Sequence, residues 1–148
     1  MILITGGSGY LGGRIASYLM KLGYDVRVGT SLSSKLEGFP VDLQSNKSLD
    51  NACKGVLCII HLAALNAQSC EKSPEKAILT NTLGTLKLLD AAKRNNVPKF
   101  LYFSTAHIYG SPLIGKIDER SLPKPAHLYS ITHRTAEDFV LQELNNEK

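Results

Sequence analysis

The sequence predicts an α/β fold in which helices cover both faces of a parallel β-sheet. Short apolar runs of the buried-strand type alternate along the chain with segments whose apolar residues recur at helical spacing. The first apolar run, Met1–Ile4, passes straight into a glycine cluster, as a buried parallel strand does before it turns. Strands and helices that alternate in this way form βαβ crossovers and a parallel sheet.

The elements before residue 63 follow in order from local patterns. Apolar residues at helical spacing predict a helix over Tyr10–Leu22, and Gly23 follows as its C-terminal stop. Tyr24–Thr30 alternates like a strand, and we expect little structure in the short polar segment Ser31–Pro40. The remaining expected elements are a small third strand at Val41–Leu43, a short helix at Lys47–Cys53 and an apolar strand at Val56–Leu62.

The second part of the chain predicts two helices, a strand and a loop. A long helix is expected from about Pro74 to Arg94, followed by a strand at Val97–Ser104. Glycines and prolines predict a loop over Gly110–Pro125, and a final helix follows over His127–Glu143. The predicted inner face of the long helix consists of Ile78, Leu83, Leu86, Leu89 and Ala92.

Composition is typical of one globular domain. The 148 residues are 43% hydrophobic and 20% charged, with a formal net charge of +4. The lysines and arginines are scattered, which argues against a nucleic-acid partner. No apolar run is long enough to span a bilayer, and no charged leader precedes one. We therefore expect residues 1–148 to form a single cytoplasmic domain.

The three cysteines indicate neither a disulfide framework nor a metal site. Cys53, Cys58 and Cys70 are odd in number and lack the spacing of metal ligands. Cys58 stands inside an apolar run, so we expect it to be a buried free thiol.

The glycine cluster predicts a turn that binds a dinucleotide. Thr5–Gly12 has the spacing T-G-x-x-G-x-x-G. In such a turn Gly6 lets the strand bend sharply, Gly9 lets backbone approach a diphosphate, and Gly12 lets the helix pack closely on the sheet. The N–H groups of the first helical turn, including those of Tyr10 and Leu11, would face the phosphates. The cluster follows a strand and opens a helix, which is the context that the motif requires.

The residues after the second strand bear on the choice between NAD and NADP. Sites that prefer NAD place a carboxylate there to bind the ribose hydroxyls, whereas this chain has Gly29, Thr30 and Ser31. The polar loop that follows would instead receive a 2′-phosphate, which modestly favours NADP. The alternative is a polar loop that touches no cofactor. The loop residues in question are Ser31, Ser33, Ser34 and Lys35.

Five segments, in order, resemble the extended short-chain dehydrogenases/reductases, a family of sugar-nucleotide epimerases, dehydratases and reductases. Besides the glycine turn, they are Asp42–Leu43, His61–Ala64, Asn81–Thr85 and Phe103–Gly110. The resemblance covers essentially the whole chain. It implies a Rossmann-like, doubly wound parallel sheet. Compared with the family, this chain would be truncated before the last strands of that sheet and before the substrate domain.

The resemblance also implies which residues surround the cofactor. Asp42 and Leu43 would meet the adenine, and His61 would pack near the adenine ribose. Asn81 would hold backbone and water beside the cofactor, although a surface amide is the alternative reading. The residues that the resemblance implies as further cofactor contacts are Leu62, Ala63, Ala64 and Ser104.

Tyr129 stands where the family keeps its catalytic tyrosine, which exchanges a proton with the substrate hydroxyl during hydride transfer. Thr105 would bind the substrate oxygen, with Ser104, facing the opposite way along a strand, as the neighbouring candidate. The family places a lysine four residues after the tyrosine, and here that position is His133. A histidine still bonds to ribose hydroxyls, but it is charged only part of the time near pH 7. Alternatively, both rings pack in a cleft without activity.

The resemblance implies an NAD(P)-dependent oxidoreductase or epimerase that acts on a nucleotide-activated sugar. Dehydration is disfavoured, because Ala106-His107 stands where dehydratases carry Asp-Glu. The helices that contain Asn81 and Tyr129 commonly pair in this family, which implies a homodimer. The rival reading is a dinucleotide-binding module without catalysis, a redox sensor or a scaffold, which His133 and the short chain both favour.

Overall fold

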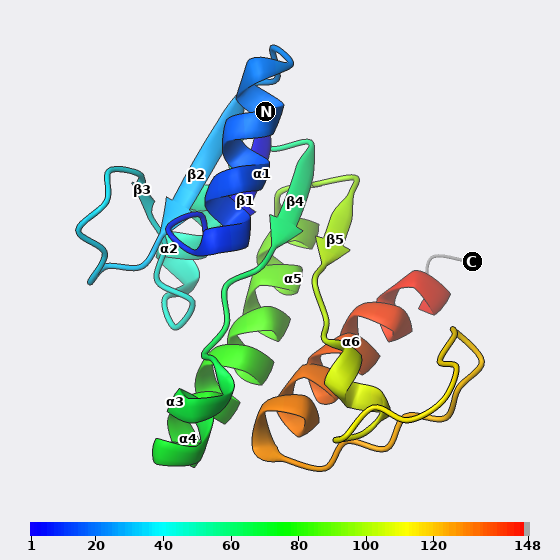
Figure 1. The fold of residues 1–148 in the computed structure, drawn as a ribbon. Helices are drawn as coiled ribbons and strands as arrows, with labels where there is room; N and C mark the ends of the chain where they lie inside the picture. Colours follow the sequence, from blue (N-terminus) through cyan, green and yellow to red (C-terminus); the bar gives the residue numbers. More distant parts are fainter. Residues whose placement is uncertain (147–148) are drawn as a thin grey trace. The chain divides into compact units, whose positions relative to one another are not determined.

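A computed structural model describes residues 1–146, which group into two compact units (Figure 1). Unit 1 consists of Met1–Ala64 and Lys87–Phe103, and unit 2 consists of Leu65–Leu86 and the residues from Ser104 onward. Each unit is a group of residues that mainly contact one another. The expectation that residues 1–148 form a single domain stays a prediction.

Unit 1 contains a five-stranded, entirely parallel sheet with the strand order β3-β2-β1-β4-β5. The central strand β1 pairs on both sides, so that Ile4 lies opposite Val28 of β2 and Ile60 of β4. This arrangement confirms the predicted α/β fold. The strands are β1 (Ile2–Thr5), β2 (Val26–Thr30), β3 (Phe39–Pro40), β4 (Cys58–His61) and β5 (Phe100–Tyr102).

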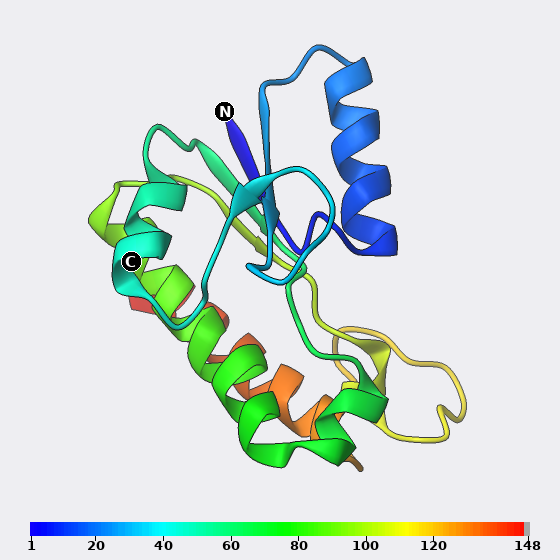
Figure 2. The same ribbon diagram turned by 90° about the vertical axis from the view of Figure 1, so that its left-hand side faces the viewer.

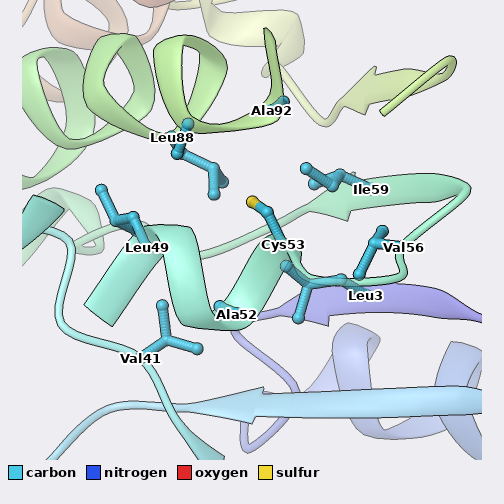
Figure 3. Packing of buried hydrophobic residues seen from close by; sticks show 10 residues of the cluster. Leu3, Val41, Leu49, Ala52, Cys53, Val56, Ile59, Leu88 and Ala92 are labelled. Carbon is cyan, nitrogen blue, oxygen red and sulfur yellow. The ribbon is translucent and has the colours of Figure 1, made fainter. Parts of the chain in front are cut away.

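Helices cover both faces of this sheet (Figure 2). Successive residues of β1 point to opposite faces, and both Leu3 and Ile4 are fully buried. Ile4 packs against Ala16 of α1 (Tyr10–Lys21). On the other face Leu3 packs in a cluster with residues of α2 (Asn46–Cys53) and of α5 (Gly84–Arg94), as Figure 3 shows. The buried strands are therefore apolar on both faces, as the sequence predicts.

Unit 2 is helical. Its helix α6 (Leu128–Asn146) packs against four shorter elements of the same unit. The short elements are α3 (Ala67–Lys72), α4 (Pro74–Ala77), a π-helical segment η1 (Ile78–Leu83) and a 3₁₀ turn η2 (Ala106–Tyr109). Elements α4, η1 and α5 follow one another without a break, which confirms the long helix predicted from about Pro74 to Arg94. The segment between η2 and α6 is the predicted loop.

The π-helical segment changes which side chains face inward. Its wider turn rotates the residues away from the 3.6-residue period on which the predicted inner face depends. Asn81 is buried as a result, whereas Ile78 is 51% exposed. The predicted inner position of Ile78 is therefore wrong.

The third strand lies two residues earlier than predicted. Phe39 pairs with Gly29, and Pro40 pairs with Thr30 at the edge of the sheet, where a proline costs no ladder hydrogen bond. Val41 donates one further bond, from its N–H to the carbonyl oxygen of Thr30 at 2.8 Å. Its side chain then enters the core with α2. The apolar character of Val41 thus reflects core packing and not a strand at Val41–Leu43.

Two other expectations need correction. Cys58 is only partly buried, whereas Cys53 and Cys70 are fully buried. The strand predicted at Val97–Ser104 shortens to Phe100–Tyr102. Within residues 1–146, no helix combines the length and the apolar character needed to cross a membrane.

Candidate functional site

The glycine turn of unit 1 is packed so tightly that side chains do not fit. Gly6 has a φ of +71°, in the left-handed region, and an added Cβ would lie 2.8 Å from the backbone nitrogen of Ala63. An added Cβ at Gly12 would lie 2.3 Å from the carbonyl oxygen of Gly6. The first turn of α1 therefore reaches the end of β1, and the end of β4 lies against the same turn.

The N-terminus of α1 is built to receive an anion. Gly9 is its N-cap and offers no side-chain hydrogen bond to the helix. The first N–H groups of an α-helix, here those of residues 10–12, lack carbonyl partners within the helix. Because the helix dipole adds partial positive charge at this end, such a terminus binds phosphate groups. The geometry fits the predicted diphosphate site.

The end of β2 lies beside this turn and carries no carboxylate. The N–H of Gly7 donates to the carbonyl oxygen of Gly29 at 2.9 Å. The next residues enter an exposed loop in which the Ser31 and Ser33 hydroxyl oxygens are 3.3 Å apart. Lys35 of this loop is also exposed. The loop thus presents hydroxyls and a cation, but its contact with a cofactor stays a prediction.

Asp42 and Leu43 follow β3 and are fixed locally. The Asp42 carboxylate accepts a hydrogen bond from the N–H of Gln44 at 2.9 Å, and the Asp42 N–H donates to the Ser48 hydroxyl at 3.0 Å. Leu43 packs against the core cluster shared with α2. Both residues are candidates for the adenine end of a dinucleotide, a role that stays a prediction.

His61 is buried and bonded to the neighbouring strand. Its side chain has no exposed surface, and its Nδ1 forms a hydrogen bond with the Thr5 hydroxyl. The ring lies 6.0 Å from that of Phe100 and 5.8 Å from that of Tyr102. The expectation that His61 packs near the adenine ribose stays a prediction, while the hydrogen bond to Thr5 joins β4 to β1. The residues after it, Leu62, Ala63 and Ala64, are partly or fully exposed and remain candidates.

In unit 2, Tyr129 occupies the first turn of α6 and belongs to a row of aromatic rings. Its ring centroid lies 4.4 Å from that of His133 and 6.1 Å from that of His127. His127 in turn lies 5.5 Å from His107. The rings of His107, His127, Tyr129 and His133 therefore contact one another in succession. Of the three histidines, only His133 was predicted to lie beside Tyr129.

His133 is neutral near pH 7. The side chain is 4% exposed, and burial lowers the pKa of its imidazole from 6.5 to about 4. The adjacent cation, Arg134, forms ion pairs with Glu137 and Asp138. The expectation of a partly charged histidine at this position is therefore wrong, because it takes no account of burial.

Thr105 and Ser104 differ in what their hydroxyls do. The Thr105 hydroxyl accepts a hydrogen bond from the N–H of His107 at 3.3 Å and caps the 3₁₀ turn η2. The Ser104 hydroxyl is buried and makes no hydrogen bond to any part of the chain that the structure describes. Because β5 ends at Tyr102, the strand alternation expected to separate the two side chains does not extend to them.

Asn81 is a buried amide and not a surface amide, while its positioning role beside the cofactor stays a prediction. It is 1% exposed, and its Oδ1 accepts a hydrogen bond from the N–H of Leu65 at 2.7 Å. Its Nδ2 donates to the hydroxyl of Thr132 at 3.1 Å. Thr132 was not among the predicted site residues, and only its position three residues after Tyr129 signals a shared helix face.

The described residues offer no metal site, since no group of three or more His, Cys, Asp or Glu side chains is placed to hold an ion. Unit 1 thus contains a phosphate cradle, and unit 2 contains a tyrosine among histidines. The glycine turn between β1 and α1 of a parallel sheet defines a nucleotide-binding fold of the Rossmann class.

Comparison with known proteins agrees with this class. Residues 2–145 match the sequence profile of the NAD dependent epimerase/dehydratase family. The chain belongs to this family, which confirms its resemblance to the extended short-chain dehydrogenases/reductases.

Individual relatives are consistent with the family. The chain is 28% identical over 152 residues to a putative UDP-glucose 4-epimerase of Methanocaldococcus jannaschii, covering 95% of this chain and 50% of that protein. It is similar to the structure of the Thermus thermophilus UDP-glucose 4-epimerase in complex with NAD, with a TM-score of 0.87 and 26% identity, covering 98% of this chain and 51% of that one. It is also similar to RMD from Pseudomonas aeruginosa complexed with NADPH, with a TM-score of 0.77 and 27% identity, covering 95% and 47%. The chain thus spans about half the length of these relatives.

Proposed function

We propose that this chain is the dinucleotide-binding and proton-transferring part of an NAD(P)-dependent oxidoreductase or epimerase that acts on a nucleotide-activated sugar. The observation that carries the proposal is the glycine cradle at the N-terminus of α1, where Gly6 and Gly12 leave no room for a Cβ. The family membership supports it, as do relatives named UDP-glucose 4-epimerase.

Unit 1 holds the dinucleotide in this proposal. The N–H groups of the α1 N-terminus bind the diphosphate, and Asp42 and Leu43 bind the adenine. Ser31 and the loop after it receive a 2′-phosphate, which makes NADP the preferred cofactor over NAD. The bound nicotinamide supplies a carbon that accepts or donates a hydride. The proposed contacts around it are Leu62, Ala63 and Ala64 of unit 1. Asn81 and Ser104, which belong to unit 2, are also proposed as contacts.

Unit 2 supplies the proton transfer. Tyr129 exchanges a proton with the substrate hydroxyl, while Thr105 donates a hydrogen bond to the substrate oxygen. A phenol is a weak base at neutral pH unless nearby positive charge stabilises its anion. Position 133 does not provide that charge, because the His133 ring is neutral. The N-terminus of α6, in whose first turn Tyr129 lies, provides part of it through the helix dipole. His133 bonds to a nicotinamide ribose hydroxyl.

The test is to separate binding from turnover. Isothermal titration of the purified chain with NADP and NAD measures binding. Transfer of label from the C4–H of a UDP-sugar to the oxidised nicotinamide, with the hydroxyl proton passing to Tyr129, measures turnover. Tyr129→Phe removes the proton and keeps the ring, so it abolishes turnover and leaves binding within about twofold. Turnover that survives Tyr129→Phe unchanged contradicts the proton-transfer role. A chain that binds neither dinucleotide contradicts the whole proposal.

A second candidate is a dinucleotide-binding module without catalysis, acting as a redox sensor or a scaffold. The neutral, buried His133 in place of a cation favours it. This reading expects tight dinucleotide binding and no label transfer with any sugar nucleotide. Measured transfer that depends on Tyr129 excludes it.

We also propose that the protein is a cytoplasmic homodimer that pairs through η1 and α6. Both helices carry exposed apolar side chains, which agrees with contact to a second copy. The exposed set is Ile78, Leu79, Ile131 and Leu141. Sedimentation analysis tests the pairing, because Ile131→Glu would yield a monomer while Leu22→Glu, at the C-cap of α1, would not.

A further inference from the structure

Thr132 is a buried junction between two elements of unit 2. The residue is 2% exposed and lies on α6, three positions after Tyr129. Its hydroxyl accepts a hydrogen bond from the Asn81 amide at 3.1 Å and donates one to the carbonyl oxygen of Tyr129 at 3.0 Å. Its own carbonyl oxygen accepts from the Thr82 hydroxyl at 3.1 Å. The side chain and the carbonyl of this residue are thereby tied to η1 and to the first turn of α6.

Asn81 extends the same chain of bonds in the opposite direction. Its Oδ1 accepts from the N–H of Leu65 at 2.7 Å, and its carbonyl oxygen accepts from the Thr85 hydroxyl at 2.7 Å. The π-helical turn of η1 is what places this amide inward. A continuous path of hydrogen bonds therefore runs from the backbone after β4 to the backbone of Tyr129.

The direction of each bond in this path is fixed by chemistry. A threonine hydroxyl has one proton to donate, and here it goes to the Tyr129 carbonyl oxygen. The hydroxyl must then act as the acceptor for Asn81, whose Nδ2 has protons to give. A serine can replace both functions, whereas a valine of nearly the same shape can replace neither.

We propose that Thr132 is a positioning residue, which holds the first turn of α6 so that Tyr129 and His133 keep their mutual arrangement. The inference rests on the proposed function, since positioning matters for turnover only if Tyr129 moves a proton. Tyr129 and His133 lie on either side of Thr132 along α6, and their rings are 4.4 Å apart. Removal of the Asn81 bond frees this turn to shift against η1, which alters that ring contact.

The experiment compares Thr132→Val with Thr132→Ser and with a matched control, Thr135→Val. Thr135 lies on the same helix and is exposed, and its hydroxyl bonds only to the Ile131 carbonyl oxygen at 3.0 Å among the interactions that the structure describes. The first readout is the NMR spectrum of the Tyr129 and His133 rings in the full chain, which does not depend on activity. The second is the pair of constants kcat and KM for a sugar nucleotide, together with the Kd for the dinucleotide.

We expect Thr132→Val to shift the ring resonances of Tyr129 and His133 and to lower kcat by about tenfold to a hundredfold. The dinucleotide Kd changes less than kcat, because the phosphate cradle of unit 1 involves neither Thr132 nor its hydrogen-bond partners. Thr132→Ser restores both readouts, and Thr135→Val changes neither. Unshifted rings and an unchanged kcat in Thr132→Val overturn the inference, as does a serine variant that behaves like valine.

Two further outcomes keep the test decisive. If Thr132→Val does not fold, Thr82→Val removes only the bond to the Thr132 carbonyl oxygen, and it must then shift the same rings. If the wild-type chain turns over no sugar nucleotide, the proposed function fails. The ring spectra still decide separately whether Thr132 sets the arrangement of Tyr129 and His133.

Discussion

The Tyr129 and His133 rings lie 4.4 Å apart, centroid to centroid, and their planes meet at 59°. Residues four apart share one face of a helix, so their spacing allows the contact. Burial lowers the pKa of His133 to about 4. The phenol therefore rests against a neutral ring where the resemblance would place a fixed positive charge.

Replacement of His133 by lysine should make proton transfer effective at lower pH. A cation within a few ångströms of a phenol stabilises its anion by the equivalent of about one to three pH units. The rate kcat rises with pH as the phenol loses its proton. We expect the midpoint of this rise to lie lower by that amount in His133→Lys. The profile of kcat against pH checks the prediction.

His133→Gln is the control for this change, because it keeps a neutral polar side chain and should leave the midpoint where it is. An identical midpoint in the lysine and glutamine variants would show that position 133 does not act on the phenol.

The same burial makes the fold sensitive to acid. The folded-state pKa of His133, about 4, lies below the ordinary histidine value of 6.5. The unfolded chain therefore binds more protons than the native one between these values, and the free energy of unfolding falls as pH drops through this window. The full shift corresponds to roughly 3 kcal/mol. Urea unfolding at about pH 7.5, 5.5 and 4.5 measures it.

A variant comparison isolates the histidine. His133→Gln should unfold with a smaller loss of stability across this pH window, while His107→Gln, at an exposed position, should lose as much as the wild type. Parallel pH curves for the wild type and His133→Gln would refute the assignment of the acid sensitivity to His133.

The sequence sufficed for the parts of the fold that depend on local pattern. The strands β1 and β4, the helix α1 and the glycine turn all follow from apolar runs and from glycines at fixed spacing. The third strand could not be predicted in this way, because Phe39–Pro40 is too short to show a pattern. Val41 is apolar because it packs in the core and not because it lies in a strand. A strand of this kind is set by pairing with β2, a tertiary interaction.

The sequence names candidate site residues but does not predict what surrounds them. The resemblance locates Tyr129 and Asn81, yet nothing local signals that Asn81 bonds to Thr132 or that His127 stacks on Tyr129. The π-helical turn that brings Asn81 inward breaks the period on which helix predictions rest. The charge of His133 depends on burial by other elements, which spacing along one helix does not report.

The close approach at Gly12 predicts a sharp contrast between neighbouring glycines. An added Cβ at Gly12 would lie 2.3 Å from the Gly6 carbonyl oxygen, whereas one at Gly13 would lie 3.3 Å from the Gly7 carbonyl oxygen. Gly12→Ala should destabilise the fold by about 1–3 kcal/mol and abolish dinucleotide binding, because the cradle must open. Gly13→Ala should change stability by less than about 1 kcal/mol, since alanine favours a helix.

Chemical unfolding and dinucleotide titration of the two variants check this contrast. Equal stability and equal binding for Gly12→Ala and Gly13→Ala would mean that the turn has room that the structure does not show.

The end of β2 predicts a change of cofactor preference. Ser31 is the first residue after β2, it is exposed, and Lys35 lies in the same loop. A carboxylate at this position accepts hydrogen bonds from the ribose hydroxyls of NAD and repels the 2′-phosphate of NADP. Ser31→Asp should therefore shift the ratio of the two Kd values toward NAD by about tenfold to a hundredfold.

Lys35→Gln should move the ratio in the same direction but less, because it removes attraction without adding repulsion. Lys21→Gln, a change of equal charge on α1, serves as the control and should leave the ratio unchanged. Titrations with both dinucleotides at two salt concentrations measure these ratios. The affinity for NADP should fall as the salt concentration rises, because salt screens charge interactions. If Ser31→Asp weakens NAD and NADP equally, the loop does not bind the adenine ribose, and the preference for NADP loses its structural basis.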